Sequence, residues 1–148
     1  MKTRTIKVTS LFPASKTEVF RRLQQFETLS KIAYPYITFT PLNGDKNLLW
    51  QPGETFTFKA KLLGFIPFGI HKINVIEFDQ NGRIYTNEQN TYVSVWNHLI
   101  ILKEVAVDST EYSDEVEIYA GWKTFFVYLW ASLFYRHRQR RWIKMLKS

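Results

Sequence analysis

Residues 122–147, close to the C-terminus, contain no Gly or Pro and follow directly on Gly121. Their apolar spacing predicts a single helix, which at 1.5 Å per residue would be about 40 Å long. One stripe at the 3.6-residue period consists of Trp122, Phe126, Leu129, Leu133, Arg136 and Arg140. A helix of this length must pack along much of its surface, so the rest of the chain has to supply a long complementary partner.

Strand patterns precede this helix along most of the chain. In residues 54–63, Phe56 and Phe58 face one way, whereas Lys59 and Lys61 face the other. Asp79-Gln80-Asn81-Gly82 has the composition of a hairpin turn. The predicted strands are 3–11, 36–40, 54–63, 69–78, 83–89, 95–105 and 112–120.

Two short helices are predicted between the first and second strands. Ser15 and Glu18 have the spacing of a capping box, with Ser15 as the N-cap and Glu18 reaching back to it. A second short helix is expected over 26–33, and Pro35 ends it. The element order is therefore one strand, two helices, a series of strands and one long helix.

This order predicts an α+β fold in one domain over residues 1–148. A single amphipathic helix cannot cover both faces of a large sheet. The favoured arrangement is therefore a curved antiparallel sheet of about six or seven strands, wrapped around the C-terminal helix with polar residues on its convex side.

The absence of Cys excludes a disulfide framework and a cysteine nucleophile, and fits a reducing compartment. The basic start of the chain is not followed by the apolar run of a secretory signal. We therefore expect a cytoplasmic protein.

The net charge of +7 is concentrated at one end of the chain. Six Lys and Arg residues lie from Arg136 to Lys147, with no acid among them, and complement the dipole of the predicted helix. They could also meet an anionic membrane surface. Nucleic acid is disfavoured, because its binding surfaces usually interleave aromatic residues with a broad basic area. The aromatic run 122–135 is too short to span a membrane.

The element order resembles the SRPBCC superfamily, also called the START-like or helix-grip fold, over nearly the whole chain. The motifs most similar to bacterial SRPBCC ligand-binding proteins are residues 110–116, 134–140, the turn at 50–53, and Trp96-Asn97-His98. The superfamily includes lipid carriers, coenzyme Q-binding proteins and polyketide aromatase/cyclases. The resemblance implies a cavity between the sheet and the long helix, and no particular activity.

Strand alternation places His71, Glu88 and His98 on the inner face of the sheet. If the hairpin at 79–82 is tight, Glu88 lies opposite Ile73, and the next hairpin brings it near Trp96. Three interpretations of the cluster remain open. It could orient a ligand, form satisfied core contacts, or supply a catalytic or metal site. No metal-binding spacing supports the last of these, so we expect neither a metal nor a cofactor.

Asp114 faces inward on the last strand. Its distance from the strand end matches the distance of Arg136 along the returning helix. We therefore expect Asp114 to form a structural ion pair with Arg136 or Arg140 that fastens the helix to the sheet.

These features predict a protein that binds, and could transport, a hydrophobic small molecule such as a lipid, isoprenoid or polyketide. The alternatives are a cyclase-like or hydratase-like enzyme that uses Glu88 with His98 or His71, and a membrane-surface or dimerisation module. The chain could be a monomer or a homodimer. The predicted ligand-binding residues are Phe56, Phe58, His71, Ile73, Glu88, Trp96, His98, Ile100, Trp122, Phe126 and Leu129.

Overall fold

A computed structural model describes residues 2–42 and 50–148. The described chain contains seven strands, two short helices and one long helix, joined to the last strand by a short 3-10 turn. Their bounds are β1 (Arg4–Phe12), α1 (Lys16–Leu23), α2 (Phe26–Ala33), β2 (Ile37–Pro41), β3 (Thr55–Leu62), β4 (Ile66–Asp79), β5 (Arg83–Asn90), β6 (Val93–Ala106), β7 (Ser109–Tyr119), η1 (Gly121–Lys123) and α3 (Thr124–Lys147).

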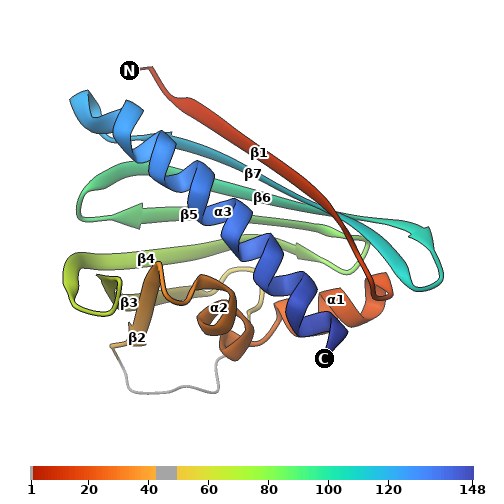
Figure 1. Cartoon of the computed structure of the whole chain (residues 1–148). Coiled ribbons are helices and arrows are strands. Elements are labelled where there is room, and N and C mark those ends of the chain that lie inside the picture. Colours follow the sequence, from red (N-terminus) through yellow and green to blue (C-terminus); the bar gives the residue numbers. More distant parts are fainter. Residues whose placement is uncertain (1, 43–49) are drawn as a thin grey trace.

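All seven strands form one antiparallel sheet in the order β1-β7-β6-β5-β4-β3-β2. β1 and β2 are consecutive strands but occupy opposite edges, and α1 and α2 carry the chain between them. α3 crosses one face of the curved sheet diagonally (Figure 1). The predicted α+β helix-grip architecture is confirmed, and the sheet is not closed into a barrel.

Alternation along the strands predicts correctly which side chains face inward. In β3, Phe56, Phe58 and Ala60 are buried, whereas Thr55 and Lys59 are exposed. The same period buries alternate residues of β6 and β7. The inner face is therefore apolar because period-two patterning sends every second side chain to the helix side.

β4 begins earlier than the predicted residue 69. Leu63 and Gly64 have φ angles of 53° and 81°, so the chain turns tightly there. This turn allows Leu62 to pair directly with Ile66. The apolar segment that follows β3 is thus part of a strand, and its first residues extend the hairpin.

Ser15 caps α1 as predicted, since its hydroxyl accepts a hydrogen bond from the Glu18 N–H at 3.1 Å. The other half of the predicted capping box is wrong. The Glu18 carboxylate bonds instead to Arg21 at 2.6 Å and Arg22 at 2.8 Å. These two cations lie one turn further along the same helix face, where an ion pair forms readily.

The C-terminal part of α3 is held by stacked aromatic rings. Phe12, the last residue of β1, lies 4.5 Å from the Tyr112 ring and 5.5 Å from the Trp142 ring, measured between centroids. All three side chains are fully buried. This contact joins both ends of the chain to β7.

The predicted stripe of the long helix faces solvent, which is a correction to the sequence analysis. Trp122 is 83% exposed and Phe126 63% exposed, and Arg136 and Arg140 are also exposed. The face toward the sheet consists of Thr124, Ala131, Phe134, Tyr135, Arg138, Gln139 and Trp142. The sheet already supplies large rings to this space, so the inner helix face combines small and polar side chains with a few aromatic ones.

Replacing Trp142 by Ala should lower the free energy of unfolding by about 3–5 kcal/mol, because the change leaves a cavity beside Phe12 and Tyr112. The same change at exposed Trp122 should alter it by no more than about 0.5 kcal/mol. Urea unfolding followed by circular dichroism measures both variants. Equal losses in the two variants would contradict the assignment of the inner helix face.

Candidate functional site

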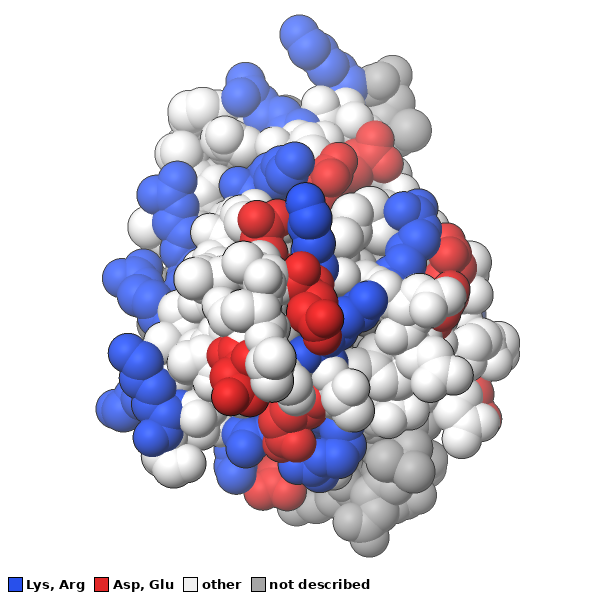
Figure 2. All heavy atoms as spheres, turned by 90° about the vertical axis from the view of Figure 1, so that its right-hand side faces the viewer, with Lys and Arg blue, Asp and Glu red and all other residues white. Residues whose placement is uncertain are grey.

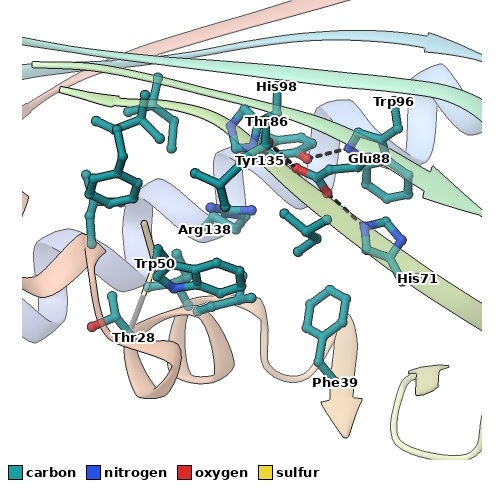
Figure 3. Close-up of a pocket in the computed structure, with 18 of the residues that line it drawn as sticks. Thr28, Phe39, Trp50, His71, Thr86, Glu88, Trp96, His98, Tyr135 and Arg138 are labelled. Atoms are coloured by element: carbon teal, nitrogen blue, oxygen red, sulfur yellow. Dashed lines mark hydrogen bonds and ion pairs between the residues drawn. The ribbon is translucent and has the colours of Figure 1, made fainter. Parts of the chain in front are cut away.

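A cavity of about 70 Å³ lies between the sheet and the helices. β4, β5 and β6 form one wall, α2 with Phe39 and Trp50 forms another, and α3 closes the third side (Figure 3). Its lining residues are Leu23, Thr28, Leu29, Ile32, Phe39, Trp50, His71, Ile73, Val75, Phe78, Ile84, Thr86, Glu88, Trp96, His98, Ile100, Phe134, Tyr135 and Arg138.

Most of this lining is aliphatic or aromatic, and its polar groups are concentrated on the sheet wall and on α3. His71, Glu88 and His98 come from the adjacent strands β4, β5 and β6, and Figure 3 shows them gathered on one side of the cavity. An apolar chamber with a few convergent polar groups is the usual composition of a small-molecule site.

Glu88 is buried and is bonded on both carboxylate oxygens. His71 Nε2 lies 2.7 Å from Oε1, and the Thr86 hydroxyl donates to Oε2 at 2.6 Å. His98 Nδ1 lies 3.7 Å from Oε2 on the other side. Three neighbouring strands therefore converge on one carboxylate.

Asn90 sets the tautomer of His71. Its Oδ1 accepts the Tyr92 N–H at 2.9 Å, so its Nδ2 is the atom that faces His71 Nδ1, at 3.2 Å. An amide nitrogen can only donate, and His71 Nδ1 must therefore accept. His71 is then a neutral imidazole that donates from Nε2 to Glu88.

A second buried carboxylate continues the network toward α3. His98 Nε2 lies 2.6 Å from Asp114 Oδ1, and Gln139 Nε2 donates to Asp114 Oδ2 at 3.0 Å. The Gln139 side chain also bonds to Ser10 and to the Val8 carbonyl. The network thus runs from the cavity through β7 and α3 to β1.

Burial opposes the charged forms of Glu88, Asp114 and His98, but the carboxylates remain ionised. Burial alone would raise the pKa of Glu88, yet the hydrogen bond from His71 and the adjacent His98 hold it below the ordinary value. Burial likewise opposes ionisation of Asp114, and the bond from His98 together with the charges of His98 and Arg138 lowers its pKa. His98 is desolvated as well, but its bonds to Asp114 and Glu88 raise its pKa.

The predicted ligand-binding residues divide into three groups. Phe56 and Phe58 pack beside the cavity, in a core cluster with Phe26 and Trp50. Trp122 in η1, and Phe126 and Leu129 on α3, are exposed and do not line the cavity. The residues that do line the cavity are His71, Ile73, Glu88, Trp96, His98 and Ile100.

The predicted ion pair of Asp114 with Arg136 or Arg140 is wrong. Asp114 does tie the helix to the sheet, but through Gln139 and with the charge of Arg138 nearby. Comparing lengths along the strand and the helix predicted the correct level of Asp114 along α3. It did not predict which face of α3 lies toward Asp114. Arg136 and Arg140 point outward, because their stripe faces solvent.

Sequence reasoning missed the helix residues that line the cavity, Phe134, Tyr135 and Arg138, and also Phe39 and Trp50. A signal for the helix residues was present. Ala131, Phe134, Arg138 and Trp142 form a second stripe at helical spacing, beside the longer predicted stripe that begins at Trp122. Among residues 2–42 and 50–148, no group of three His, Asp or Glu side chains is placed to hold a metal ion.

Asp114→Asn should lower the free energy of unfolding at neutral pH by on the order of 3 kcal/mol, because it leaves His98 without its closest anion. It should also change the pH profile. Asp114 has a pKa lowered from 3.8, so its contribution is present above that pH and is lost as pH falls through the folded pKa. His98 has a pKa raised from 6.5, so its contribution is present below that pH and is lost as pH rises through the folded value.

Wild type should therefore lose stability toward both extremes of pH, and both slopes should be shallower in Asp114→Asn. Urea unfolding across the pH range measures this. Glu111→Gln, which removes one negative charge from the exposed face of β7, serves as a control for a general charge effect. Parallel profiles for wild type and Asp114→Asn would contradict the coupling.

Solved structures show the same fold with little sequence similarity. A START superfamily protein from Mycobacterium smegmatis superposes with a TM-score of 0.74 at 14% identity, over 97% of each chain. Protein CV1439 from Chromobacterium violaceum gives 0.73 at 14% identity, over 97% of this chain and 98% of that one. DynU16, a putative protein in the dynemicin biosynthetic locus, gives 0.65 at 11% identity, over 97% of this chain and 47% of its own. The chain therefore has a START-like fold.

No curated protein matches the sequence. A family model described as a domain of unknown function, DUF8410, matches residues 10–146. That match takes in the end of β1, every element from α1 to η1, nearly all of α3 and every residue that lines the cavity. The chain belongs to the DUF8410 family.

Proposed function

We propose that the chain, as one domain over residues 1–148, binds a small and largely apolar molecule in the cavity between the sheet and α3. The observation that carries this proposal is the composition of the cavity wall. Aromatic and aliphatic side chains surround a few polar groups that point inward from β4, β5, β6 and α3 (Figure 3). Burying an apolar ligand against such a wall is favourable, and the polar groups orient the ligand.

The cavity volume limits the size of the ligand. At about 70 Å³ it is well below the roughly 300–1,000 Å³ of sites for drug-sized ligands. We therefore propose a compact ligand, such as a substituted single ring. A lipid, isoprenoid or polyketide would require lining rings such as Trp50 or Phe39 to move.

The pairing of the polar groups favours binding over catalysis. A general base must be basic enough to take the substrate's proton. Glu88 accepts hydrogen bonds from His71 and Thr86, its pKa is held below the ordinary value, and His98 is held by Asp114. A carboxylate with a lowered pKa is a weak base, which disfavours an enzyme that uses Glu88 with His98 or His71. The START-like neighbours are consistent with a ligand-binding role, although their likeness concerns the fold alone.

Filling the cavity should abolish binding. Val75 lines the cavity and is buried, whereas its neighbour Ile76 is 53% exposed on the opposite face of β4. Val75→Phe should weaken binding at least tenfold, because the added ring occupies the ligand's volume, and Ile76→Phe should bind like wild type. Native mass spectrometry of the purified protein identifies any retained ligand. Quenching of Trp50 and Trp96 fluorescence by cumene and acetophenone measures affinity.

Equal binding by the two variants would place the ligand elsewhere. A wild-type protein that retains nothing and binds neither probe would overturn the proposed function. Thermal unfolding of both variants establishes that a lost affinity does not reflect a lost fold.

A second function is favoured by the outer face of α3. We propose that this face contacts an anionic membrane surface. We call the face the outer stripe and define it as Trp122, Phe126, Leu129, Leu133, Arg136, Arg140, Lys144 and Lys147, all of which are exposed. At 100° per residue these side chains lie within about 40° of one line along the helix.

The outer stripe changes character halfway along. Its first half, from Trp122 to Leu133, carries large apolar side chains that are 46% to 83% exposed. Its second half, from Arg136 to Lys147, carries only cations. Figure 2 views the end of the molecule where α3 finishes, and Lys and Arg line its left-hand edge, the side on which α3 lies.

An anionic bilayer complements both halves, since apolar side chains enter the interface and cations meet lipid phosphates. A second copy of the chain would have to accommodate the same cluster of cations, which repel one another. None of the helices within the described ranges is long and apolar enough to cross a membrane.

Cosedimentation with phosphatidylglycerol-containing vesicles should capture the wild-type protein, and binding should weaken with salt. Phosphatidylcholine vesicles should capture much less. Arg136→Gln with Arg140→Gln should reduce binding at least fivefold. The control, Lys59→Gln with Lys61→Gln, removes the same charge from the outer face of β3 and should not. Equal losses from the two pairs, or a concentration-dependent dimer that occupies the stripe, would contradict this role.

A further inference from the structure

Arg138 is a buried cation in an otherwise largely apolar cavity. Its side chain is 7% exposed, and it reaches the cavity from α3. Figure 3 shows its guanidinium pointing into the space lined by Trp50, Thr86 and Tyr135. A permanent charge in such a position is costly unless its hydrogen-bond donors are satisfied.

Aromatic rings hold the guanidinium in place but leave donors unused. Its central carbon lies 5.0 Å from the centre of the Tyr135 ring and 5.7 Å from that of Phe134. These contacts stabilise the positive charge. They do not accept the N–H groups in the plane of the guanidinium, and Nε is buried with no hydrogen-bond partner among the described residues.

The two buried carboxylates nearby are bonded to other groups. Glu88 is held by His71 and Thr86, and Asp114 by His98 and Gln139. Both attract Arg138 through their charge, but the hydrogen bonds of the network are made without its Nε. A buried donor left unpaired is destabilising. A ligand that supplied an acceptor would remove that cost.

We infer that Arg138 binds an acceptor oxygen of the ligand, a carbonyl or a carboxylate, and thereby orients the ligand in the cavity. The inference rests on the proposed function and names the chemical class of the molecule bound there. Guanidinium has only donors, so its partner must be an acceptor. Its Nε–H and the adjacent Nη–H point in parallel along one edge of the guanidinium, so a small shift of the side chain would present this edge to one or two oxygens in the cavity.

The charges of the network affect whether the ligand's oxygen belongs to a neutral carbonyl or to a carboxylate. His98 lies between the carboxylates of Glu88 and Asp114, whose bonds and charges raise its pKa and favour its protonated form. In that form, His98 and Arg138 balance Glu88 and Asp114. A neutral carbonyl keeps the cavity electrically balanced, and a carboxylate adds one negative charge next to Arg138.

Three probes of similar size separate these possibilities: cumene, which is apolar, acetophenone, which carries a carbonyl, and benzoate. Wild-type protein should bind acetophenone or benzoate at least tenfold more tightly than cumene. Arg138→Met keeps the volume and removes the donors, so it should abolish that preference while still binding cumene. Arg138→Lys should retain part of it. Arg83→Met, a control at an exposed position of β5, should behave like wild type.

Affinities from Trp fluorescence quenching would be accompanied by NMR of the Arg138 Nε–H resonance, which should shift with the oxygen-bearing probes and not with cumene. Whichever oxygen-bearing probe binds more tightly supports the inference and identifies the form of the oxygen. Equal affinity for all three probes in wild type, or an unchanged preference in Arg138→Met, would overturn it while leaving the proposed function intact. Failure of wild type to bind any probe would overturn the proposed function instead.

Discussion

The buried network of hydrogen bonds and one ion pair that runs from His71 to Gln139 is the interaction on which the rest of the structure depends. It passes through Glu88, His98 and Asp114, so one network joins β4, β5, β6, β7 and α3. Each group is desolvated and would be destabilising alone, and each is stabilised by its neighbours. The network fixes the height of α3 over the sheet, and with it the position at which Arg138 enters the cavity.

The two faces of α3 serve different purposes because they meet different environments. The inner face carries Ala131 and Gln139, which allow the helix to approach strands that already bear large rings. The outer face carries exposed apolar side chains followed by cations, which is an unusual surface for a helix that faces only water. Ligand binding on one face and membrane contact on the other are therefore physically independent proposals, and each can fail without the other.

Much of the fold could be predicted from the sequence because strand alternation is a local property. Inward-facing Phe58, His71, Trp96 and Asp114 were identified from period two alone, and all of them are buried. Glu88 lies opposite Ile73, as the tight hairpin at 79–82 predicts, but the hairpin closes at Asp79 and Arg83 and a bulge between Val75 and Glu77 restores this register. The face of the long helix that packs on the sheet was harder to predict, because aromatic residues occur on all sides of this helix. A pattern with two stripes at the same spacing does not indicate which one faces the sheet, so the partner of Asp114 was predicted wrongly.

The amino-acid sequence by itself determined the element order, the inner face of each strand and the presence of charged groups within the sheet. Each of these follows from the spacing of residues close together in the chain. Only the tertiary structure decided the rotation of α3 about its axis, the pairing of Asp114 with His98 and Gln139, and the entry of Arg138 into the cavity. These features depend on how side chains from distant segments of the chain pack together in the core, and no local sequence pattern determines that packing.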